Sequence, residues 1–568
     1  MRAAALSRWL PGVDVARRYE RVWLRDDVTA GLVLTALLIP AGIGYAQVAG
    51  LPPEAGLYAT IVPLLVYALV GPSRILVLGP DSSLAPIIAA SVLPLAAGDP
   101  QRAVALAGLL ALLMGVILVL GGLMRIGFVT DLLSKPIRIG YLNGIALVVV
   151  VGQLPALLGF SVEPRSLPGK IRAIAEGISD GSVGGTALAV GLCSLVVIVA
   201  LRASGSRVPG VAVAVVGSVL ITAVLGWRDQ LPVVGALPEG LPAPALEGLR
   251  WGDVASLAGP AFGIALIAFA DTGVLSRTFA ARRGKTVDGS QEMTAIGAAN
   301  IAGGLFGGFP VSASASRTPV SEQAGARTQA AGVVGALLII GFVLLAPGLT
   351  RYLPSSALAA VVIVAAASLV DLQGLAWLIR TDRIEATLSV SAFLGVTFVG
   401  VLQGIAIAIG LSFVAFVNQA WRPYRAELGR IAGVRGYHDL SRHPEARRVP
   451  GIVIVRFDAP LFFANGGIFD DFVRSVVDAA ENVHTVILAA EPITDIDTTA
   501  VDELVELDDF LQSREITLLI AEMKGPVKDQ IRRYRLGDRF GPERFLPTVG
   551  AAVDAVTGEF RGDLEPPS

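Results

Sequence analysis

The feature that most constrains this chain is a succession of long apolar tracts that carry no charge. Asp, Glu, Lys and Arg are absent from the tracts Ala103–Met124, Val183–Leu201, Val208–Trp227 and Thr328–Thr350. A bilayer core of about 30 Å is crossed by about 20 apolar residues of helix. Only 16% of the chain is charged, against about 25% in soluble domains. The sequence therefore predicts an α-helical polytopic membrane protein.

The spacing of the apolar tracts predicts about fourteen membrane spans within a transport domain over residues 28–421. Thr387–Trp421 is too long for one span, and Gly400–Gly404 offers a turn in its middle. The predicted spans are 28–50, 56–71, 82–97, 104–124, 137–158, 184–203, 208–227, 256–276, 289–306, 314–327, 330–349, 355–370, 385–400 and 403–421.

The distribution of basic residues predicts the orientation. The N-terminal segment 1–27 carries Arg and acids and has no apolar core typical of a signal peptide. Basic side chains also gather at Lys135 and Arg138 and at 277–285. With an even number of spans and the positive-inside rule, both termini are expected in the cytoplasm of a cell-membrane protein.

Two of the predicted spans begin with a break. The runs Gly79-Pro80-Asp81 and Phe309-Pro310 each follow a short extended stretch and precede more apolar residues. Each break is third in a group of seven spans. Discontinuous helices at matching positions of two halves are typical of transporter sites built from inverted repeats. Either motif alone is a weak signal, because membrane helices tolerate Gly and Pro.

A dry helix start favours an anion. Its first N–H groups have no partner within the helix, and the macrodipole places about half a positive charge there. Arg317 adds a fixed positive charge that is costly at membrane depth without a partner. Hydroxyl donors near the breaks come from Ser82, Ser83, Ser312, Ser314 and Ser316. Each serine has an alternative role in hydrogen bonding within or between helices.

Two acidic residues are candidates for coupling a cation or proton. Asp271 is the only charged side chain between Val254 and Ser276, and an intramembrane carboxylate is a functional candidate. The alternative is an interfacial pair with Arg277 or Arg282. Asp81 either caps its own half-helix, in competition with substrate, or turns away. The residues leave that choice open.

The character of the chain changes after Pro450. Apolar strands predicted at 451–457, 485–489 and 516–521 alternate with helices near 467–480, 498–513, 525–536 and 548–557. This alternation predicts a small soluble α/β domain over 450–558, after a linker at 422–449 and before a flexible tail at 559–568. One Cys and three scattered His offer no basis for a disulfide or a metal site, and the net charge of −2 shows no nucleic-acid footprint.

Four motifs resemble the sulfate permease (SulP) family of anion transporters. LIPAGIGYAQVAGLPPEAGLY at 38–58 is similar to the family's first-helix signature, and GFPVSASASRT at 308–318 is similar to its tenth-helix motif. PGIVIVRFDAPLFFAN at 450–465 and ITDIDTTA at 493–500 resemble its C-terminal STAS domain. The resemblance covers nearly the whole chain.

The resemblance implies seven-plus-seven inverted repeats with two discontinuous helices, core and gate subdomains, a cytoplasmic STAS domain and a homodimer. It places Asp271 at an acidic position implicated in cation coupling. It places Thr498 where related domains carry a phosphorylated serine, although Asp497 and Thr498 also fit a simple helix cap. The implied substrate site comprises Tyr45, Gly79, Pro80, Asp81, Ser82, Ser314, Ala315, Ser316 and Arg317.

The leading hypothesis is therefore secondary active uptake of a small inorganic oxyanion, first sulfate, coupled to H+ or Na+. Asp81 stands where many family members have an uncharged residue, which favours symport over exchange. Sodium-coupled bicarbonate and C4-dicarboxylate transport are the alternatives, and an anion channel is a different class. A nucleobase transporter would need paired carboxylates in place of the serines near Arg317. Nothing resembles a nucleophile with its base, so neither an enzyme nor a cofactor is expected, beyond a co-transported ion.

Overall fold

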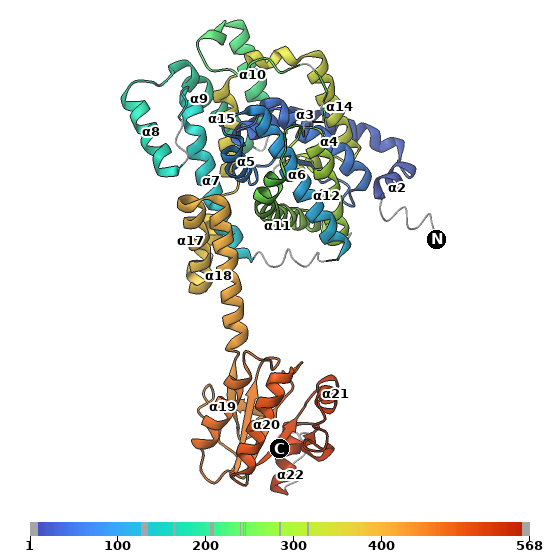
Figure 1. Cartoon of the computed structure of the whole chain (residues 1–568), viewed down its shortest axis with the longest axis vertical. Coiled ribbons are helices and arrows are strands. Elements are labelled where there is room, and N and C mark those ends of the chain that lie inside the picture. The colour runs from blue at the N-terminus through green and yellow to red at the C-terminus, as the bar shows by residue number, and fades with distance from the viewer. Residues whose placement is uncertain are drawn as a thin grey trace. The chain divides into compact units, whose positions relative to one another are not determined.

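The structure is a computed structural model that describes residues 10–125, 134–162, 166–204, 209–238, 240–241, 243–244, 246–282, 284, 286–314 and 317–558. The chain divides into two compact units, residues 1–412 and 413–568. The first is helical and the second contains a six-stranded sheet. Figure 1 shows both units, and each is described by itself below.

Each of the fourteen predicted spans overlaps one helix among the described residues. The helices are α3 (Arg21–Val48), α4 (Pro53–Val70), α5 (Ala85–Ala96), α6 (Pro100–Leu123), α7 (Lys135–Leu158), α9 (Gly185–Ala203), α10 (Gly210–Val224), α11 (Trp251–Ala281), α12 (Gly289–Leu305), α13 (Arg317–Gln323), α14 (Ala330–Leu345), α15 (Ser355–Ala367), α17 (Arg383–Leu394) and α18 (Val401–Trp421). A π-helical turn, Gly395–Val399, extends α17 up to the predicted break at Gly400.

The helices differ in length for a physical reason. Seven stretches of the described chain are long and apolar enough to cross a bilayer unaided, whereas α5, α10 and α14 are apolar but shorter. A short extended segment, β1 or β2, comes before each of the two helices that follow a predicted break, α5 and α13. The helices α8 (Leu167–Ser179) and α16 (Leu372–Thr381) connect spans, and α2 (Pro11–Arg17) precedes the first span.

Glycine allows α6 and α12 to pack closely along their length (Figure 1). A Cβ added at Gly304 would lie 2.5 Å from the carbonyl oxygen of Gly108, and one at Gly297 would lie 2.7 Å from that of Gly115. Small residues at such contacts let two membrane helices gain van der Waals packing without a hydrophobic driving force. The position of α12 is therefore fixed by α6.

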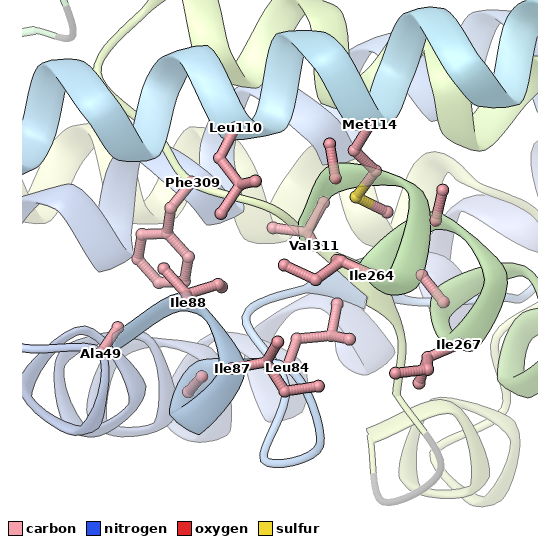
Figure 2. Close-up of a cluster of buried hydrophobic side chains, with 14 of the residues drawn as sticks. Ala49, Leu84, Ile87, Ile88, Leu110, Met114, Ile264, Ile267, Phe309 and Val311 are labelled. Atoms are coloured by element: carbon pink, nitrogen blue, oxygen red, sulfur yellow. The ribbon is translucent and has the colours of Figure 1, made fainter. Parts of the chain in front are cut away.

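An apolar cluster fixes the positions of both breaks. Figure 2 shows Leu84, which follows the first break, near Val311, which precedes β2 at the second break. Side chains of α6 and α11, including Met114 and Ile264, cover them. All four side chains are fully buried. Because interiors are close-packed, neither break can move without displacing its neighbours.

The second unit is a mixed sheet covered on both faces. Its strands run in the order β4-β3-β5-β6-β7-β8, antiparallel for the first three and parallel from β5 onward. Alternate residues of β5 face opposite layers, since Val453 packs with α19 and α20 whereas Ile454 packs with α22. The elements are β3 (Arg425–Arg430), β4 (Tyr437–Asp439), β5 (Ile452–Phe457), α19 (Gly466–Asp478), β6 (Thr485–Ala489), α20 (Thr498–Gln512), β7 (Thr517–Ala521), α21 (Gly525–Arg533), β8 (Phe545–Leu546) and α22 (Val549–Thr557).

The segment 422–449, which we expected to be a linker, differs from that expectation. It contains β3 and β4, which extend the sheet past β5. The short strands were missed because their polar residues mask the pattern. In β3 only Ala426 and Leu428, together with Gly429, turn inward, as an edge region allows.

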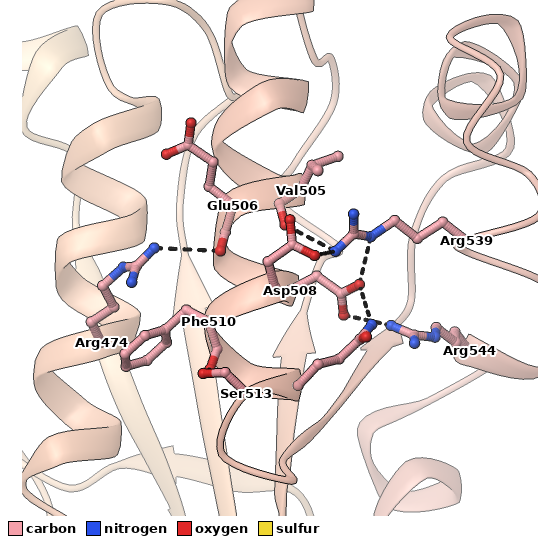
Figure 3. Close-up of polar contacts among 10 residues, drawn as sticks. Arg474, Val505, Glu506, Asp508, Phe510, Ser513, Arg539 and Arg544 are labelled. Atoms are coloured by element: carbon pink, nitrogen blue, oxygen red, sulfur yellow. Dashed lines mark hydrogen bonds and ion pairs between the residues drawn. The ribbon is translucent and has the colours of Figure 1, made fainter.

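A buried carboxylate ties α20 to the chain after α21. Asp508 is fully buried and accepts hydrogen bonds from Arg539 Nε at 2.7 Å, Arg544 Nη1 at 2.6 Å and Gln512 Nε2 at 2.8 Å. Figure 3 shows both arginines converging on it. Both arginine side chains keep partial solvent contact.

We predict that Asp508→Ala lowers the free energy of unfolding of the C-terminal domain by about 3 kcal/mol, since it leaves two arginines without their buried partner. Urea denaturation of the purified domain measures this. The control is Asp509→Ala. Asp509 is exposed and pairs only with Arg539, so its loss should cost less than about 1 kcal/mol. Equal effects of the two variants would show that burial does not set the strength of this contact.

Candidate functional site

The two predicted breaks meet as a pair of short antiparallel strands. β1 (Leu78–Gly79) pairs with β2 (Ser312–Ala313), with Leu78 opposite Ala313 and Gly79 opposite Ser312. The amide of Ser314 also donates to the carbonyl of Val77 at 3.0 Å. Non-helical backbone at membrane depth is tolerated only where it is satisfied by protein or lines a cavity. The pairing of β1 with β2 meets that requirement.

Side chains on neighbouring helices hold both strands in register. Asn300 of α12 accepts from the amide of Val311 at 2.8 Å and donates to its carbonyl at 3.0 Å, as a partner strand would. Thr272 of α11 accepts from the amide of Ala313, and Thr318 accepts from that of Val77. Sequence reasoning missed these residues. Asn300, a lone amide in an apolar span, was the signal available.

Arg317 lies against the first break. Its side chain is buried, and its Nη2 donates to the carbonyl oxygen of Pro80. A Cβ at Gly79 would lie 3.3 Å from Nη1, so glycine leaves room for the guanidinium. Its Nε and Nη1 atoms are buried and have no hydrogen-bond partner among the described residues. The same holds for the hydroxyl of Ser312. Buried donors without partners are costly, and an anion would satisfy them.

Asp81 bonds within the turn that precedes α5 and does not cap the helix itself, whose N-cap is Leu84. Its Oδ1 accepts from the amide of Ser83 at 3.1 Å and from the Ser83 hydroxyl at 3.0 Å. Its backbone carbonyl accepts from the amide of Ala85, the first residue of α5. The carboxylate therefore uses an amide that a bound anion would otherwise take. At the second break, the Ser314 hydroxyl likewise accepts from the amide of Arg317.

Asp271 of α11 joins this group through Ser83. The Ser83 hydroxyl that bonds Asp81 lies 3.5 Å from Asp271 Oδ2, and the Tyr141 hydroxyl donates to Asp271 Oδ1 at 3.3 Å. Arg282, one of the alternative partners predicted for Asp271, pairs instead with Glu322 at 3.1 Å. Tyr141 belongs to α7 and was missed, because only the fold brings α7 to α11.

A cavity of about 280 Å³ opens onto these residues. The residues that line it include Asp81, Ser82, Ser83, Asp271 and Ala313, together with the charged residues Lys135, Arg138 and Asp371. A water molecule occupies about 30 Å³ in the liquid, so the cavity is large enough for a small ion with part of its hydration shell. Arg317, Tyr45 and Ser314 are buried and are not among the residues that line it.

The remaining predicted site residues are placed as follows. The Tyr45 phenol is buried near Ser82 and Arg317. Ala315 and Ser316 lie outside the described residues. Thr498 is exposed as the first residue of α20, where Asp497 caps the helix by accepting from the amide of Ala500 at 2.9 Å. Among the described residues, no cluster of three or more His, Cys, Asp or Glu is placed to hold a metal ion.

Comparison with known proteins gives two family matches. Residues 24–392 match the sulfate permease family, and residues 443–552 match the STAS domain. A probable sulfate transporter of Mycobacterium tuberculosis (strain ATCC 25618 / H37Rv) is 39% identical over 549 residues, which are 96% of this chain and 98% of the relative. Sulfate transporter 1.3 of Arabidopsis thaliana is 29% identical over 582 residues, covering 98% of this chain and 88% of the relative.

Two solved structures share the fold. The murine solute carrier 26 family member A9, an anion transporter in the inward-facing state, gives a TM-score of 0.90 at 22% identity, covering 98% of this chain and 95% of the other. The transmembrane domain of a cyanobacterium bicarbonate transporter, BicA, gives 0.60 at 20% identity, covering 69% of this chain and 98% of the other. At these identities the likeness concerns the fold alone.

We predict that Asn300→Leu lowers the stability of the membrane unit, because it leaves the amide and carbonyl of Val311 unpaired in a dry interior. Each unsatisfied group costs about 1–3 kcal/mol, so thermal unfolding in detergent should begin several degrees lower. The control is Thr294→Val. Thr294 also lies on α12 but bonds only the carbonyl of Ser290 in its own helix. An unchanged transition for Asn300→Leu would show that β2 is held without it.

Proposed function

Because this chain belongs to the sulfate permease family, we propose that it is a secondary active transporter of a small inorganic oxyanion, with sulfate as its first substrate. The chain is a multi-pass membrane protein of a transporter family, with a C-terminal STAS domain, and not an enzyme. Both termini are proposed to face the cytoplasm and two chains to form a homodimer.

The buried guanidinium of Arg317 is the observation that carries the anion. Two of its nitrogen atoms have no partner among the described residues, beside a break whose backbone is already paired. A buried charge requires a counter-charge or hydrogen bonds. Asp81 lies near enough to act electrostatically on the guanidinium. An oxyanion that enters from the cavity would compete with the Asp81 carboxylate for the positive charge of Arg317. Its binding would therefore replace the electrostatic interaction between Asp81 and Arg317.

The carboxylates of Asp81 and Asp271 supply a place for coupling. They share the Ser83 hydroxyl and face the same cavity. Two carboxylates so close repel each other when both are ionised, and a proton or Na+ relieves that repulsion. Moving one negative charge inward against about 100 mV costs about 2.3 kcal/mol, and a dianion about twice that. Symport of H+ or Na+ would offset this cost.

The relatives favour sulfate over the alternatives, since the two named above are a probable sulfate transporter and a sulfate transporter. Bicarbonate rests on a likeness of fold to one bicarbonate transporter. A C4-dicarboxylate would require a second cationic contact beside Arg317. A channel would show unitary currents across a planar bilayer, which a carrier does not produce.

The first test is uptake of radiolabelled sulfate into proteoliposomes under an imposed proton or sodium gradient, with bicarbonate or succinate as competitors. We expect gradient-driven sulfate uptake. Arg317→Gln should reduce it by about 10- to 100-fold, the worth of charge-assisted hydrogen bonds. Arg282→Gln, which removes an exposed arginine paired with Glu322, is the control. No sulfate flux under any gradient would overturn the proposal, and succinate or bicarbonate flux in its place would select the alternative.

Coupling is tested with Asp271→Asn and Asp81→Asn. Asp271→Asn should abolish gradient-driven accumulation while sulfate–sulfate exchange continues, because the anion contacts remain.

Asp81→Asn should flatten the pH profile of uptake and lower the KM for sulfate, because it removes the carboxylate that competes for Arg317. Asp229→Asn, at an exposed position, is the control. Accumulation and pH profiles identical to wild type in both variants would place coupling elsewhere in the chain.

A further inference from the structure

The helix α12 contributes no residue to the wall of the cavity. Its side chains nevertheless contact the chain ahead of each paired strand, at Val311 before β2 and at Tyr67 before β1. Asn300 holds the segment that enters β2. We propose that Glu292, eight residues earlier on α12, is a positioning residue for anion binding that fixes, through Tyr67, the segment 71–77 that enters β1. This inference rests on the proposed anion site beside Pro80 and adds a residue that sets its affinity.

Glu292 is buried without a cation. Its side chain has no solvent exposure, the Tyr67 hydroxyl donates to its Oε1, and no ion pair found among the described residues includes it. Its second oxygen, Oε2, has no partner among the described residues. A carboxyl group in such surroundings is expensive to bury. Among the described residues, the hydrogen bond from Tyr67 is the one that holds the Glu292 side chain. It is therefore the contact through which Glu292 acts on the segment before β1.

Tyr67 connects this bond to the segment before β1. It lies in the last turn of α4, and its backbone carbonyl accepts from the amide of Gly71 at 2.7 Å. A Cβ at Gly71 would lie 2.5 Å from the ring carbon Cε1, so the ring rests directly on the glycine. Ser73 lies beside the phenol. Moving the Tyr67 ring therefore moves the chain at Gly71 and Ser73.

The segment 71–77 is also held by Gln329, which precedes α14. Gln329 Nε2 donates to the carbonyls of Ser73 and Leu76, both at 2.9 Å. The next residue, Val77, donates to Thr318, and β1 then begins. The segment thus contacts both the Tyr67 ring and the Gln329 side chain. Its position determines where the Pro80 carbonyl meets Arg317.

This arrangement makes a prediction that differs from a purely structural role. A bond that only stabilises the fold would change unfolding and yield, but not the KM of the folded transporter. A bond that positions β1 would change the KM at constant kcat, and an amide at position 292 would preserve it, because Gln still offers an oxygen to the Tyr67 hydroxyl.

The experiment compares Glu292→Gln, Glu292→Leu, Tyr67→Phe and the double variant Tyr67→Phe/Glu292→Leu in proteoliposomes. We expect Glu292→Gln to keep the wild-type KM for sulfate within about twofold. Glu292→Leu and Tyr67→Phe should each raise the KM by about tenfold at unchanged kcat, the worth of one hydrogen bond to a polar buried group. The double variant should add little to either, because both changes remove one interaction. Thr294→Val is the control on α12.

A second readout does not depend on transport. Amide hydrogen exchange of peptides covering 71–84, measured without anion, should be faster in Glu292→Leu and Tyr67→Phe and unchanged in Glu292→Gln. Wild-type protein that takes up no sulfate would defeat the proposed substrate, while the exchange comparison would still decide the positioning role. The inference would be overturned if Glu292→Leu kept the amide hydrogen exchange and the KM of the wild-type protein and only its unfolding temperature fell.

Discussion

The membrane unit depends on four residues of extended backbone that pair within it. Leu78 and Gly79 face Ser312 and Ala313, although the chain between them spans half of the helices. A helix satisfies its own backbone, but a broken helix does not, and lipid offers no substitute. Each break alone would therefore be unstable, whereas together they satisfy each other. This mutual requirement explains why buried polar side chains around the breaks, such as Asn300 and Thr318, form hydrogen bonds with main-chain atoms of the breaks.

Charge at this junction is balanced between groups that belong to different helices. Arg317 follows the second break but donates to Pro80 in the first, and Asp81 lies near it while sharing Ser83 with Asp271 of α11. In the sequence, an acidic residue follows the first break and a basic residue follows the second. In the fold, Asp81 lines the cavity, whereas Arg317 is buried and is not among the residues that line it. An ion in the cavity therefore meets carboxylates, serines and the basic side chains of Lys135 and Arg138, whereas the guanidinium of Arg317 is outside the cavity wall.

The lengths of the charge-free apolar tracts predicted the helices because a bilayer demands long apolar segments, and each predicted span overlaps a helix. The same reasoning found both breaks and the candidates Asp81, Asp271 and Arg317. It did not find Tyr141, Asn300, Tyr67 or Glu292, whose roles depend on contacts between helices far apart in sequence. A hydroxyl or amide in an apolar tract looks the same in sequence whether it bonds its own helix, as Thr294 does, or a distant strand, as Asn300 does. In the C-terminal domain, the polar residues of β3 concealed a strand for the same reason, because its partner was unknown.

The placement of α12 would separate the groups that set anion affinity from the carboxylates proposed for coupling. The carboxylates that would bind a coupling ion lie on α11 and just before α5, and both face the cavity. Several of the groups that fix the paired strands, among them Asn300 and Glu292 of α12 and Tyr67 at the end of α4, are not in the cavity wall. Close glycine packing holds α12 against α6, so it serves as a rigid reference for both breaks. A change in the charge of Asp81 or Asp271 can then alter the field at Arg317 without shifting the backbone that holds it. The bound anion and the coupling ion would then affect each other through the charges of Asp81, Asp271 and Arg317. In a low dielectric, a single charge at such short range changes the binding free energy of an ion strongly.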